Sequence, residues 1–281
     1  MSSFDPQWLS LREPADRRSR APGPRDACAG HFSGRERITI LDLGAGTGSN
    51  LRASWDHLPA RQDWRLVDHD PALLEAARRT LSAWAAAPRP DGERLAFARS
   101  GKVLTVSFER ADLRTEIERL IARRPDLVTA AAFFDLVSHT WIDRFADALA
   151  GARLPLYAVL TYDGNARWEP GHPVDAEVDA AFHEHQTRDK GFGPAAGPQA
   201  AQALSAALRA RGYAVETGDS PWRLTRDDSG LIQALADGIE QAVGETGRVP
   251  PGALAAWREA HRRPVRSEIG HVDLFARPQV A

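Results

Sequence analysis

Apolar and polar positions follow two periods along the chain, and these periods predict strands and helices in turn. Short apolar runs rich in β-branched residues predict buried strands over 38–43, 64–67, 103–108, 126–131 and 156–161. Amphipathic stretches between these runs predict helices from Ser49 and over 73–84, 115–123 and 138–150. Such alternation is typical of βαβ units, so we expect an α/β fold with a mostly parallel sheet and helices on both faces.

The rest of the chain extends this pattern. Residues 200–211 predict a helix that ends at Gly212, and further strands are expected from Tyr213 and over 271–276. Residues 95–98 and Ser100-Gly101 predict a hairpin that leads into the strand at 103–108, after a loop marked by Pro88, Pro90 and Gly92. We therefore predict a Rossmann-like sheet of seven strands.

The first 34 residues are polar, rich in arginine and interrupted by prolines. Phe4, Trp8 and Leu11 recur at the spacing of one helix face, which predicts a short amphipathic helix followed by an irregular segment. We expect residues 1–34 to form a helical extension, either docked on the main domain as a lid or simply packed against it.

A second segment, 226–264, is inserted before the last strand. It predicts two helices, over 229–243 and 254–261. The first carries an apolar face made of Leu231, Leu235 and Ile239. Such a face must be buried, so we expect the insertion and the N-terminal segment to form a mobile cap over the acceptor site, a homodimer interface being the alternative. The Rossmann-like domain then comprises residues 35–225 and 265–281.

The amino-acid composition limits the classes of molecule that the protein is expected to bind. The chain has 281 residues, 26% of them charged, with a formal net charge of −2. Without a basic excess, nucleic acid and anionic membranes are poor main partners, and a small-molecule acceptor is expected. Cys28 is the only cysteine, which excludes an intramolecular disulfide and a cysteine zinc cluster. The sequence shows no signal-peptide pattern and no apolar run near ~20 residues, so we expect a cytoplasmic protein.

The sharpest motif is a glycine-rich turn between the first strand and the next helix. It reads Asp42-Leu43-Gly44-Ala45-Gly46-Thr47-Gly48-Ser49-Asn50. Gly44 and Gly46 permit positive φ angles in a tight turn, and Gly48 leaves room for a ligand to approach the backbone. Ser49 occupies the position where a dinucleotide fingerprint has its third glycine, which disfavours an NAD-dependent oxidoreductase.

This turn resembles motif I of the class I methyltransferases that use S-adenosylmethionine (SAM). Asp68 ends the second strand twenty residues after Gly48, and a carboxylate there can accept both ribose hydroxyls of a nucleoside. Asp70 reads instead as the N-cap of the helix that Pro71 begins. Asp112 matches the family's adenine-binding position, with a plain helix cap as the alternative.

The resemblance covers about residues 36–162, and the overall pattern also resembles a bacterial group of such enzymes. It implies SAM as cofactor and S-adenosylhomocysteine (SAH) as product. The residues that it implies for cofactor binding are Asp42, Gly44, Ala45, Gly46, Gly48, Asn50, Asp68, His69, Asp112, Leu113 and Ala130.

The acceptor should bind beyond the carboxyl ends of the strands. The run from Thr129 to Asp135 departs from the Asn/Asp-Pro-Pro-Tyr/Phe signature of methylases that act on nucleic-acid bases. Polar and aromatic groups follow the strands here and also fill the segment 172–198, which we expect to form a loop over the site. We expect acceptor contacts from Asp135, Tyr162, Trp168 and Lys190, and a turn at Asp163-Gly164-Asn165 fits the same region.

A general base would remove a proton from a hydroxyl or a protonated amine. The candidates are His139, His183, His185 and Asp163. On a helix His183 and His185 would point to different faces, so no metal site is expected. The sequence thus predicts methyl transfer to an oxygen or nitrogen of a small molecule. A non-catalytic SAM-binding scaffold protein and an NAD-dependent oxidoreductase remain as alternatives.

Overall fold

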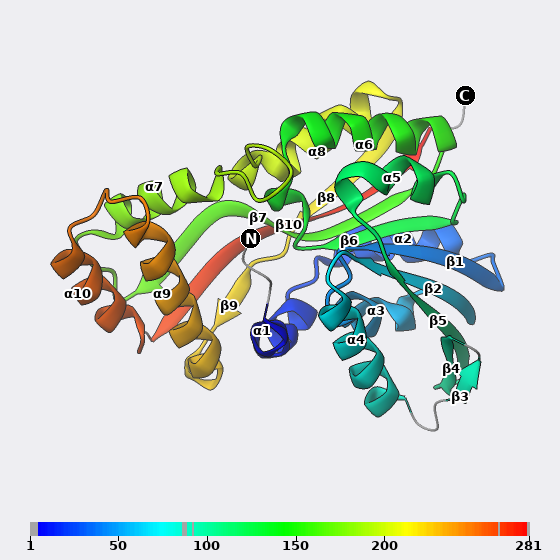
Figure 1. Cartoon of the computed structure of the whole chain (residues 1–281), viewed down its shortest axis with the longest axis horizontal. Coiled ribbons are helices and arrows are strands. Elements are labelled where there is room, and N and C mark those ends of the chain that lie inside the picture. Colours follow the sequence, from blue (N-terminus) through cyan, green and yellow to red (C-terminus); the bar gives the residue numbers. More distant parts are fainter. Residues whose placement is uncertain (1–4, 86–88, 92, 264, 280–281) are drawn as a thin grey trace.

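One mixed β-sheet runs through the whole chain in the computed structural model (Figure 1). The structure describes residues 5–85, 89–91, 93–263 and 265–279. Within these residues ten strands join the sheet, in the order β3-β4-β5-β2-β1-β6-β7-β10-β8, with β9 paired to β10. The strands are β1 (Arg37–Leu43), β2 (Arg61–Asp68), β3 (Arg89–Asp91), β4 (Arg94–Arg99), β5 (Lys102–Arg110), β6 (Leu127–Ala131), β7 (Leu156–Glu169), β8 (Tyr213–Asp219), β9 (Trp222–Leu224) and β10 (Arg266–Pro278).

The central strands confirm the predicted fold class. β5, β2, β1, β6 and β7 are parallel, whereas β10 runs antiparallel to both β7 and β8. The carboxyl ends of the parallel strands therefore meet at one edge, which is where α/β sheets bind ligands.

The sheet is larger than the predicted seven strands. The hairpin of β4 and β5 is confirmed, but the expected loop around Pro90 instead forms β3, paired antiparallel to β4. An edge strand tolerates a proline because one side of its backbone needs no partner. Pro88 and Gly92 lie outside the described residues. Short polar strands such as β3 carry little apolar pattern, so periodicity does not reveal them.

Helices cover both faces of the sheet. One face is packed by α2, α3 and α4, and the other by α5, α6 and α8. Buried aromatic and aliphatic side chains fill both layers, among them Trp64 on the first face and Phe145 on the second. The helices are α1 (Pro6–Arg18), α2 (Pro22–Phe32), α3 (Ser49–Ser54), α4 (Pro71–Trp84), α5 (Leu113–Ile121), α6 (His139–Ala152), α7 (Asp175–Gln186), α8 (Ala200–Ala210), α9 (Ser229–Gly244) and α10 (Pro251–His261).

A helical lobe extends the sheet at one side (Figure 1). We define it as α7, α9, α10, β9 and the outer halves of β7 and β10, which pair as far as Glu169 and Arg266. The lobe has its own core, built around Trp168, Trp257 and Ile269. The two helices expected over 226–264 are confirmed as α9 and α10, but they form part of this larger unit.

Two local predictions inside the lobe were wrong. The expected turn at Asp163-Gly164-Asn165 lies within β7, and register shifts between β7 and β10 absorb the irregularity. The expected loop over 172–198 contains α7, which buries Val178 and Ala181 in the lobe core. Those two apolar positions are too few for the sequence pattern to separate a helix from a polar loop.

The N-terminal segment forms two helices rather than a helix and an irregular stretch. Pro22 occupies the first turn of α2, a position where its missing N–H costs nothing. α1 leaves Leu11 37% exposed and buries Arg12 and Asp16, while Phe4 lies outside the described residues. Polar contacts explain this face: Arg12 pairs with Asp16 at 2.9 Å, and Trp222 Nε1 donates to Asp16 at 3.0 Å.

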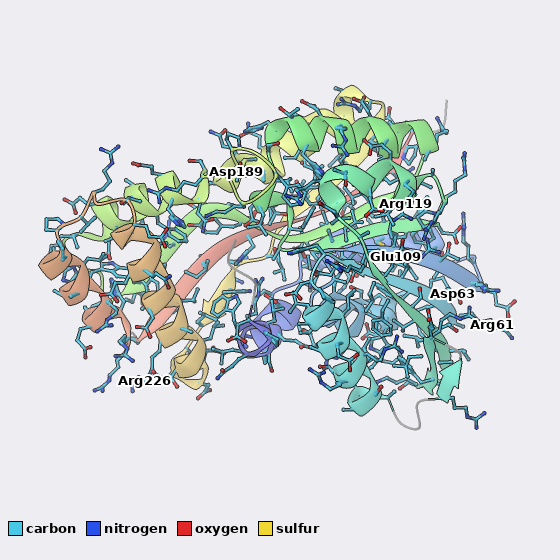
Figure 2. All side chains as sticks on the ribbon, viewed as in Figure 1. Arg61, Asp63, Glu109, Arg119, Asp189 and Arg226 are labelled. Carbon is cyan, nitrogen blue, oxygen red and sulfur yellow. The ribbon has the colours of Figure 1, made fainter. Side chains whose placement is uncertain are left out.

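Charges of both signs are mixed over the surface (Figure 2). Arg61 and Asp63 lie at the amino end of β2, and Glu109 pairs with Arg119 at 3.1 Å beside α5. Among the described residues, no helix combines the length and apolarity that crossing a bilayer requires.

Candidate functional site

The glycine-rich turn connects β1 to α3 at the carboxyl edge of the sheet. Gly44, Gly46 and Gly48 have φ angles of +60°, +53° and +77°, a region that side chains disfavour. A Cβ atom on Gly44 would lie 2.9 Å from Phe133 Cδ2, and one on Gly46 would lie 3.1 Å from Leu9 Cδ1. The turn therefore needs glycine at these positions, and it is packed between α1 and the segment after β6.

Asp42 lies directly beneath the turn and is fully buried. Its Oδ1 accepts a hydrogen bond from Asn50 Nδ2 at 2.8 Å, and Asn50 also donates to Thr129. Its Oδ2 is buried without a hydrogen-bond partner. Burial raises the pKa of Asp42 to about 7, although the Asn50 hydrogen bond acts in the opposite direction. The turn thus holds a carboxylate oxygen that is available to a ligand donor.

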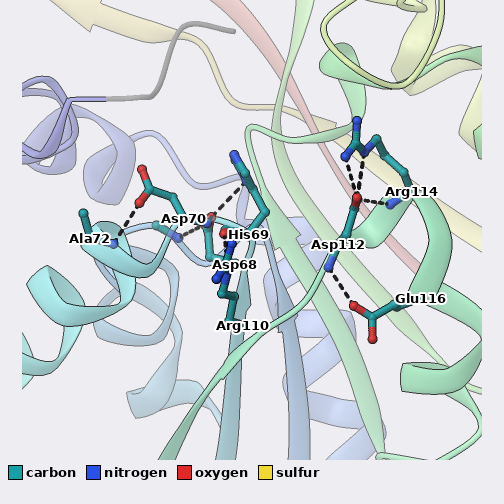
Figure 3. A network of polar contacts seen from close by, with 9 residues as sticks. Asp68, His69, Asp70, Ala72, Arg110, Asp112, Arg114 and Glu116 are labelled. Carbon is teal, nitrogen blue, oxygen red and sulfur yellow. Dashed lines mark hydrogen bonds and ion pairs between the residues drawn. The ribbon is translucent and has the colours of Figure 1, made fainter.

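Asp68 ends β2 next to the turn (Figure 3). Its Oδ2 accepts from Gly46 N at 2.9 Å, and its Oδ1 accepts from Asp70 N at 3.0 Å. His69 Nδ1 lies 3.3 Å from the same carboxylate, with most of its side chain exposed. Asp70 caps α4 by accepting from Ala72 N at 2.8 Å, which confirms the cap that the sequence predicts.

Asp112 lies at the start of α5, beside the Asp68 group (Figure 3). It caps the helix by accepting from Arg114 N at 2.9 Å, and the Arg114 guanidinium contacts both carboxylate oxygens. These bonds lower the pKa of Asp112. Leu113 and Ala130 are both buried, Leu113 at the start of α5 and Ala130 on β6.

Asp135, one of the predicted acceptor-binding residues, lies in the short 3-10 helix Phe134–Leu136 that follows β6. Its Oδ1 is buried without a hydrogen-bond partner. Burial raises the pKa of Asp135 to about 6, against the opposing effects of a hydrogen bond from its own backbone N–H and of the positive charges on Arg12 and Lys190. Phe133, two residues earlier, packs edge-on against other rings, including Phe192. These rings form an apolar cluster next to the 3-10 helix.

Tyr162 and His183 face each other from β7 and α7. His183 Nε2 lies 2.8 Å from Gly164 O and 3.4 Å from the Tyr162 hydroxyl. A carbonyl only accepts, so we assign the proton of His183 to Nε2. The Tyr162 hydroxyl hydrogen then stays free for another acceptor. Burial raises the pKa of Tyr162, which keeps this hydroxyl neutral.

His185 lies on a different side of α7, as a helix requires. Its Nε2 lies 3.1 Å from Glu245 Oε2, and its Nδ1 lies 3.4 Å from Lys190 Nζ. Within the described part of the chain no group of three or more His, Cys, Asp or Glu side chains is arranged to hold a metal ion.

The three other predicted site residues make contacts of their own. His139 is exposed in the first turn of α6. Asp163 Oδ1 accepts from Asn165 N at 2.8 Å, and the carboxylate lies against Gly270. Trp168 is part of the lobe core, stacked on His261 at 4.9 Å. The structure therefore pairs Tyr162 with His183 and Lys190 with His185, whereas His139 and Trp168 lie elsewhere.

Sequence reasoning missed two buried groups near the site. His271 lies between the rings of Trp222 and Tyr162, and its Nδ1 is 3.0 Å from Ile269 O. Burial lowers the pKa of His271 to about 3, so the ring is neutral. Arg20 lies between α1 and α2, with Nε and Nη1 buried and without partners. Because the sequence predicts an irregular segment here, it does not indicate where the Arg20 side chain lies.

Comparisons with known proteins show the fold. No protein-family model matches the sequence, and no curated protein gives a significant match. The YcgJ protein from Bacillus subtilis is similar in structure, with a TM-score of 0.50 and 11% identity over 92% of this chain and 99% of that chain. The cyclopropane synthase MmaA2 from Mycobacterium tuberculosis has a TM-score of 0.47 and 12% identity over 89% of this chain and 82% of that chain. The mycolic acid cyclopropane synthase CmaA1, complexed with SAH, has a TM-score of 0.49 and 14% identity over 90% of this chain and 81% of that chain. Strand order and the likeness to YcgJ confirm the Rossmann-like α/β fold that we expect of a class I SAM-dependent methyltransferase.

Proposed function

We propose that this protein is a methyltransferase that binds SAM and methylates an oxygen or nitrogen atom of a small-molecule acceptor. The observation that carries the proposal is the glycine-rich turn, with Asp42 beneath it and Asp68 beside it. Three glycines at positive φ, a buried carboxylate oxygen without a partner and a strand-end carboxylate fit an adenosine ligand that carries an amino group. The solved structure of CmaA1 contains SAH, which supports the same choice of cofactor.

The protein's task in such a reaction is to position its ligands. SAM supplies a methyl group on a sulfonium, which is already a good electrophile. Asp68 would accept hydrogen bonds from the ribose, and the backbone of the turn would allow close approach. Leu9 and Phe133 cover the turn, so binding would require both side chains to move aside.

The acceptor site is proposed at Asp135, Tyr162 and Lys190. The unpartnered oxygen of Asp135 can accept a proton from the acceptor, and its pKa of about 6 suits a general base near neutral pH. The neutral Tyr162 hydroxyl can donate to the acceptor. We therefore rank Asp135 ahead of His139 and Asp163 as the proton acceptor.

The cap that the sequence predicts is retained as a proposal. α1 lies between the helical lobe and the Rossmann-like unit (Figure 1). It contacts the turn through Leu9, and it pairs with the lobe through Arg18 and Asp228 at 2.7 Å. These contacts support a role for α1 and the lobe in excluding water from the transferred methyl group. A cytoplasmic location is likewise proposed, since the sequence has one cysteine, Cys28, and a protein without an intramolecular disulfide fits a reducing compartment.

Calorimetry with SAH and with NAD tests the cofactor. SAH is expected to bind and NAD is not, because an NAD pyrophosphate offers no donor to the Asp42 carboxylate. Binding of NAD without binding of SAH would refute the proposal. Labelled SAM incubated with a pool of small metabolites then separates an enzyme from a silent SAM-binding scaffold, since only an enzyme transfers the label.

Asp68→Ala is expected to weaken SAH binding by about 10- to 100-fold, because charge-assisted hydrogen bonds contribute roughly 1.5–3 kcal/mol. Asp70→Ala is the matched control. It removes an exposed helix cap, costs about 1 kcal/mol of stability and should leave SAH affinity nearly unchanged. Titration calorimetry and thermal melting of both variants measure the two effects. If Asp70→Ala has the larger effect on affinity, the ribose contact belongs to Asp70.

A further inference from the structure

A β-bulge interrupts β7 just before Tyr162, a residue of the proposed acceptor site. The register between β7 and β10 shifts here by one residue, so that two residues of β7, the second of them Leu160, lie opposite the single residue Asp273 of β10. Leu160 has a φ of +56°, a left-handed conformation that is rare for leucine, and its side chain is 1% exposed. A buried residue keeps such a conformation only where its surroundings hold it there.

The bulge decides which residue of β7 faces His271. On the inner side of the bulge, Ala158 lies opposite Leu274. If the ladder continued from there without a bulge, His271 would face Thr161, whereas its observed partner is Tyr162. Opposed residues of two strands point to the same face of a sheet, and the rings of Tyr162 and His271 accordingly lie 6.2 Å apart. The position of the Tyr162 ring therefore depends on the bulge.

The side chain of Asp273 holds the bulge in place. A bulge takes backbone groups out of the ladder, and the Leu160 N–H donates instead to Asp273 Oδ1 at 2.7 Å. The same oxygen accepts from Ser220 Oγ at 2.6 Å, and Oδ2 accepts from Ala21 N at 2.9 Å. Burial raises the pKa of Asp273, while the positive charge of Arg20 and these three hydrogen bonds lower it. Because hydrogen bonds to a carboxylate are charge-assisted, the three donors fix the position of this buried group.

The bond to Ala21 connects the bulge with the N-terminal helices. Ala21 is the N-cap residue of α2, and a Cβ atom on Gly218 of β8 would lie 2.9 Å from Ala21 Cβ. The link between α1 and α2 is therefore packed closely on the sheet. α1 in turn covers the glycine-rich turn through Leu9. One buried carboxylate thus joins the N-terminal helices to the strand that carries Tyr162.

We propose that Asp273 is a positioning residue for the acceptor. It acts through Leu160 to fix the place of Tyr162, and its bond to Ala21 keeps the N-terminal helices docked on the same strand. This inference rests on the proposed function, in which the Tyr162 hydroxyl donates to the acceptor. A binding group is effective when its surroundings hold it within about 0.5 Å of the productive geometry, and a bulge held by a buried carboxylate supplies that rigidity.

Fluorine NMR of protein labelled with 3-fluorotyrosine reports on Tyr162, because the chain has only three tyrosines. Tyr162→Phe identifies its signal, and the buried Tyr213 serves as an internal reference. Asp273→Ala is expected to shift or broaden the Tyr162 signal and to leave the Tyr213 signal unchanged. Ser220→Ala is the matched control, since it removes one donor to the same carboxylate and keeps the bond from Leu160. It should leave the Tyr162 signal in place.

A pair of conservative substitutions tests whether the bond from Leu160 carries the effect. In Asp273→Asn the amide oxygen can still accept from Leu160 N, but the amide nitrogen then faces the Ala21 N–H, which is another donor. Ala21→Pro removes this N–H, and Ala21 has a φ of −67°, which proline adopts. The double variant Ala21→Pro/Asp273→Asn should therefore show the same Tyr162 signal as Ala21→Pro alone.

Methyl transfer provides the functional readout, with labelled SAM and the pool of small metabolites as the probe. Asp273→Ala is expected to lower the transfer by about 10- to 100-fold while SAH affinity changes by less than about twofold, because a misplaced acceptor loses alignment and not cofactor binding. The double variant should transfer the label within about threefold of Ala21→Pro alone.

Exchange of the Leu160 amide in the wild type covers the case in which Asp273→Ala does not fold. This amide should exchange as slowly as those of β6, because it donates to a buried acceptor. An unchanged Tyr162 signal in Asp273→Ala, an equal shift in Ser220→Ala, no recovery in the double variant, or fast exchange of the Leu160 amide would each overturn the inference. Failure of the wild type to bind SAH would instead refute the proposed function, and the Tyr162 signal of the ligand-free protein would still be measurable.

Discussion

Gly44→Ala is expected to weaken SAH binding by roughly 100-fold, about 2.7 kcal/mol, and to destabilise the ligand-free protein. Gly44 has a φ of +60°, and an alanine there carries about 1–2 kcal/mol of backbone strain. Its Cβ would also lie 2.9 Å from Phe133 Cδ2, a distance at which something must shift. Overpacking of this kind typically costs about 1–3 kcal/mol. The turn would change shape where the cofactor is proposed to bind.

Gly101→Ala is the matched control for this experiment. Gly101 has a φ of +79° in the turn between β4 and β5, but a Cβ there has no atom within 4 Å. It therefore imposes backbone strain of about 1–2 kcal/mol without a clash. Thermal melting should show a smaller loss than for Gly44→Ala, and calorimetry should show unchanged SAH affinity. Equal losses of affinity in the two variants would mean that the turn does not form the cofactor site.

The Rossmann-like unit could be predicted because its strands, turns and helix caps depend on residues that are close together in the sequence. The strand at 38–43 is a continuous apolar run, and the glycines that follow it adopt the positive φ angles that the motif requires. Asp70 was recognisable as a cap because capping needs only the adjacent helix start, and the structure confirms it. Signals of this kind depend on neighbours in the sequence.

The helical lobe was harder to predict because its stability comes from distant contacts. β7 continues beyond residue 161 through mostly polar residues, since it pairs with β10 about a hundred residues later. α7 has only a narrow apolar face, and Asp175 at its start accepts hydrogen bonds from Trp257 and His261 of α10. Neither feature leaves a regular period in the local sequence.

The interior of the site was also hidden from sequence reasoning. His271 and Arg20 are single polar residues in otherwise ordinary segments, and only the fold places His271 beside Tyr162 and buries two nitrogen atoms of Arg20. Conversely, Trp168 is an aromatic residue of the kind that often lines ligand pockets, yet its ring is packed in the core of the lobe. Residue type alone does not distinguish these roles, because burial and partners decide them.

The lobe core provides the second large effect. Trp257→Ala is expected to destabilise the lobe by about 3–5 kcal/mol, because truncating a buried aromatic leaves a cavity. Trp257 is 1% exposed, and its ring packs at 5.7 Å from Trp168 and 4.9 Å from His261. Its Nε1 also donates to Asp175 at 2.8 Å, so the truncation removes both packing and a hydrogen bond.

Hydrogen exchange can show which part of the protein loses stability in Trp257→Ala. Because the lobe has a separate core, Trp257→Ala should reduce protection in α7, α9 and α10 while β1, β2 and β6 stay protected and SAH still binds. Trp257→Phe keeps a ring against Trp168 and loses the hydrogen bond and part of the ring volume, so its cost should be clearly smaller than that of Trp257→Ala. If Trp257→Ala instead removes protection from the central strands and abolishes SAH binding, the lobe and the Rossmann-like unit fold as one cooperative body. Acceptor binding would be lost in either case, because α7 carries His183 and supports Tyr162 from the lobe side of the site.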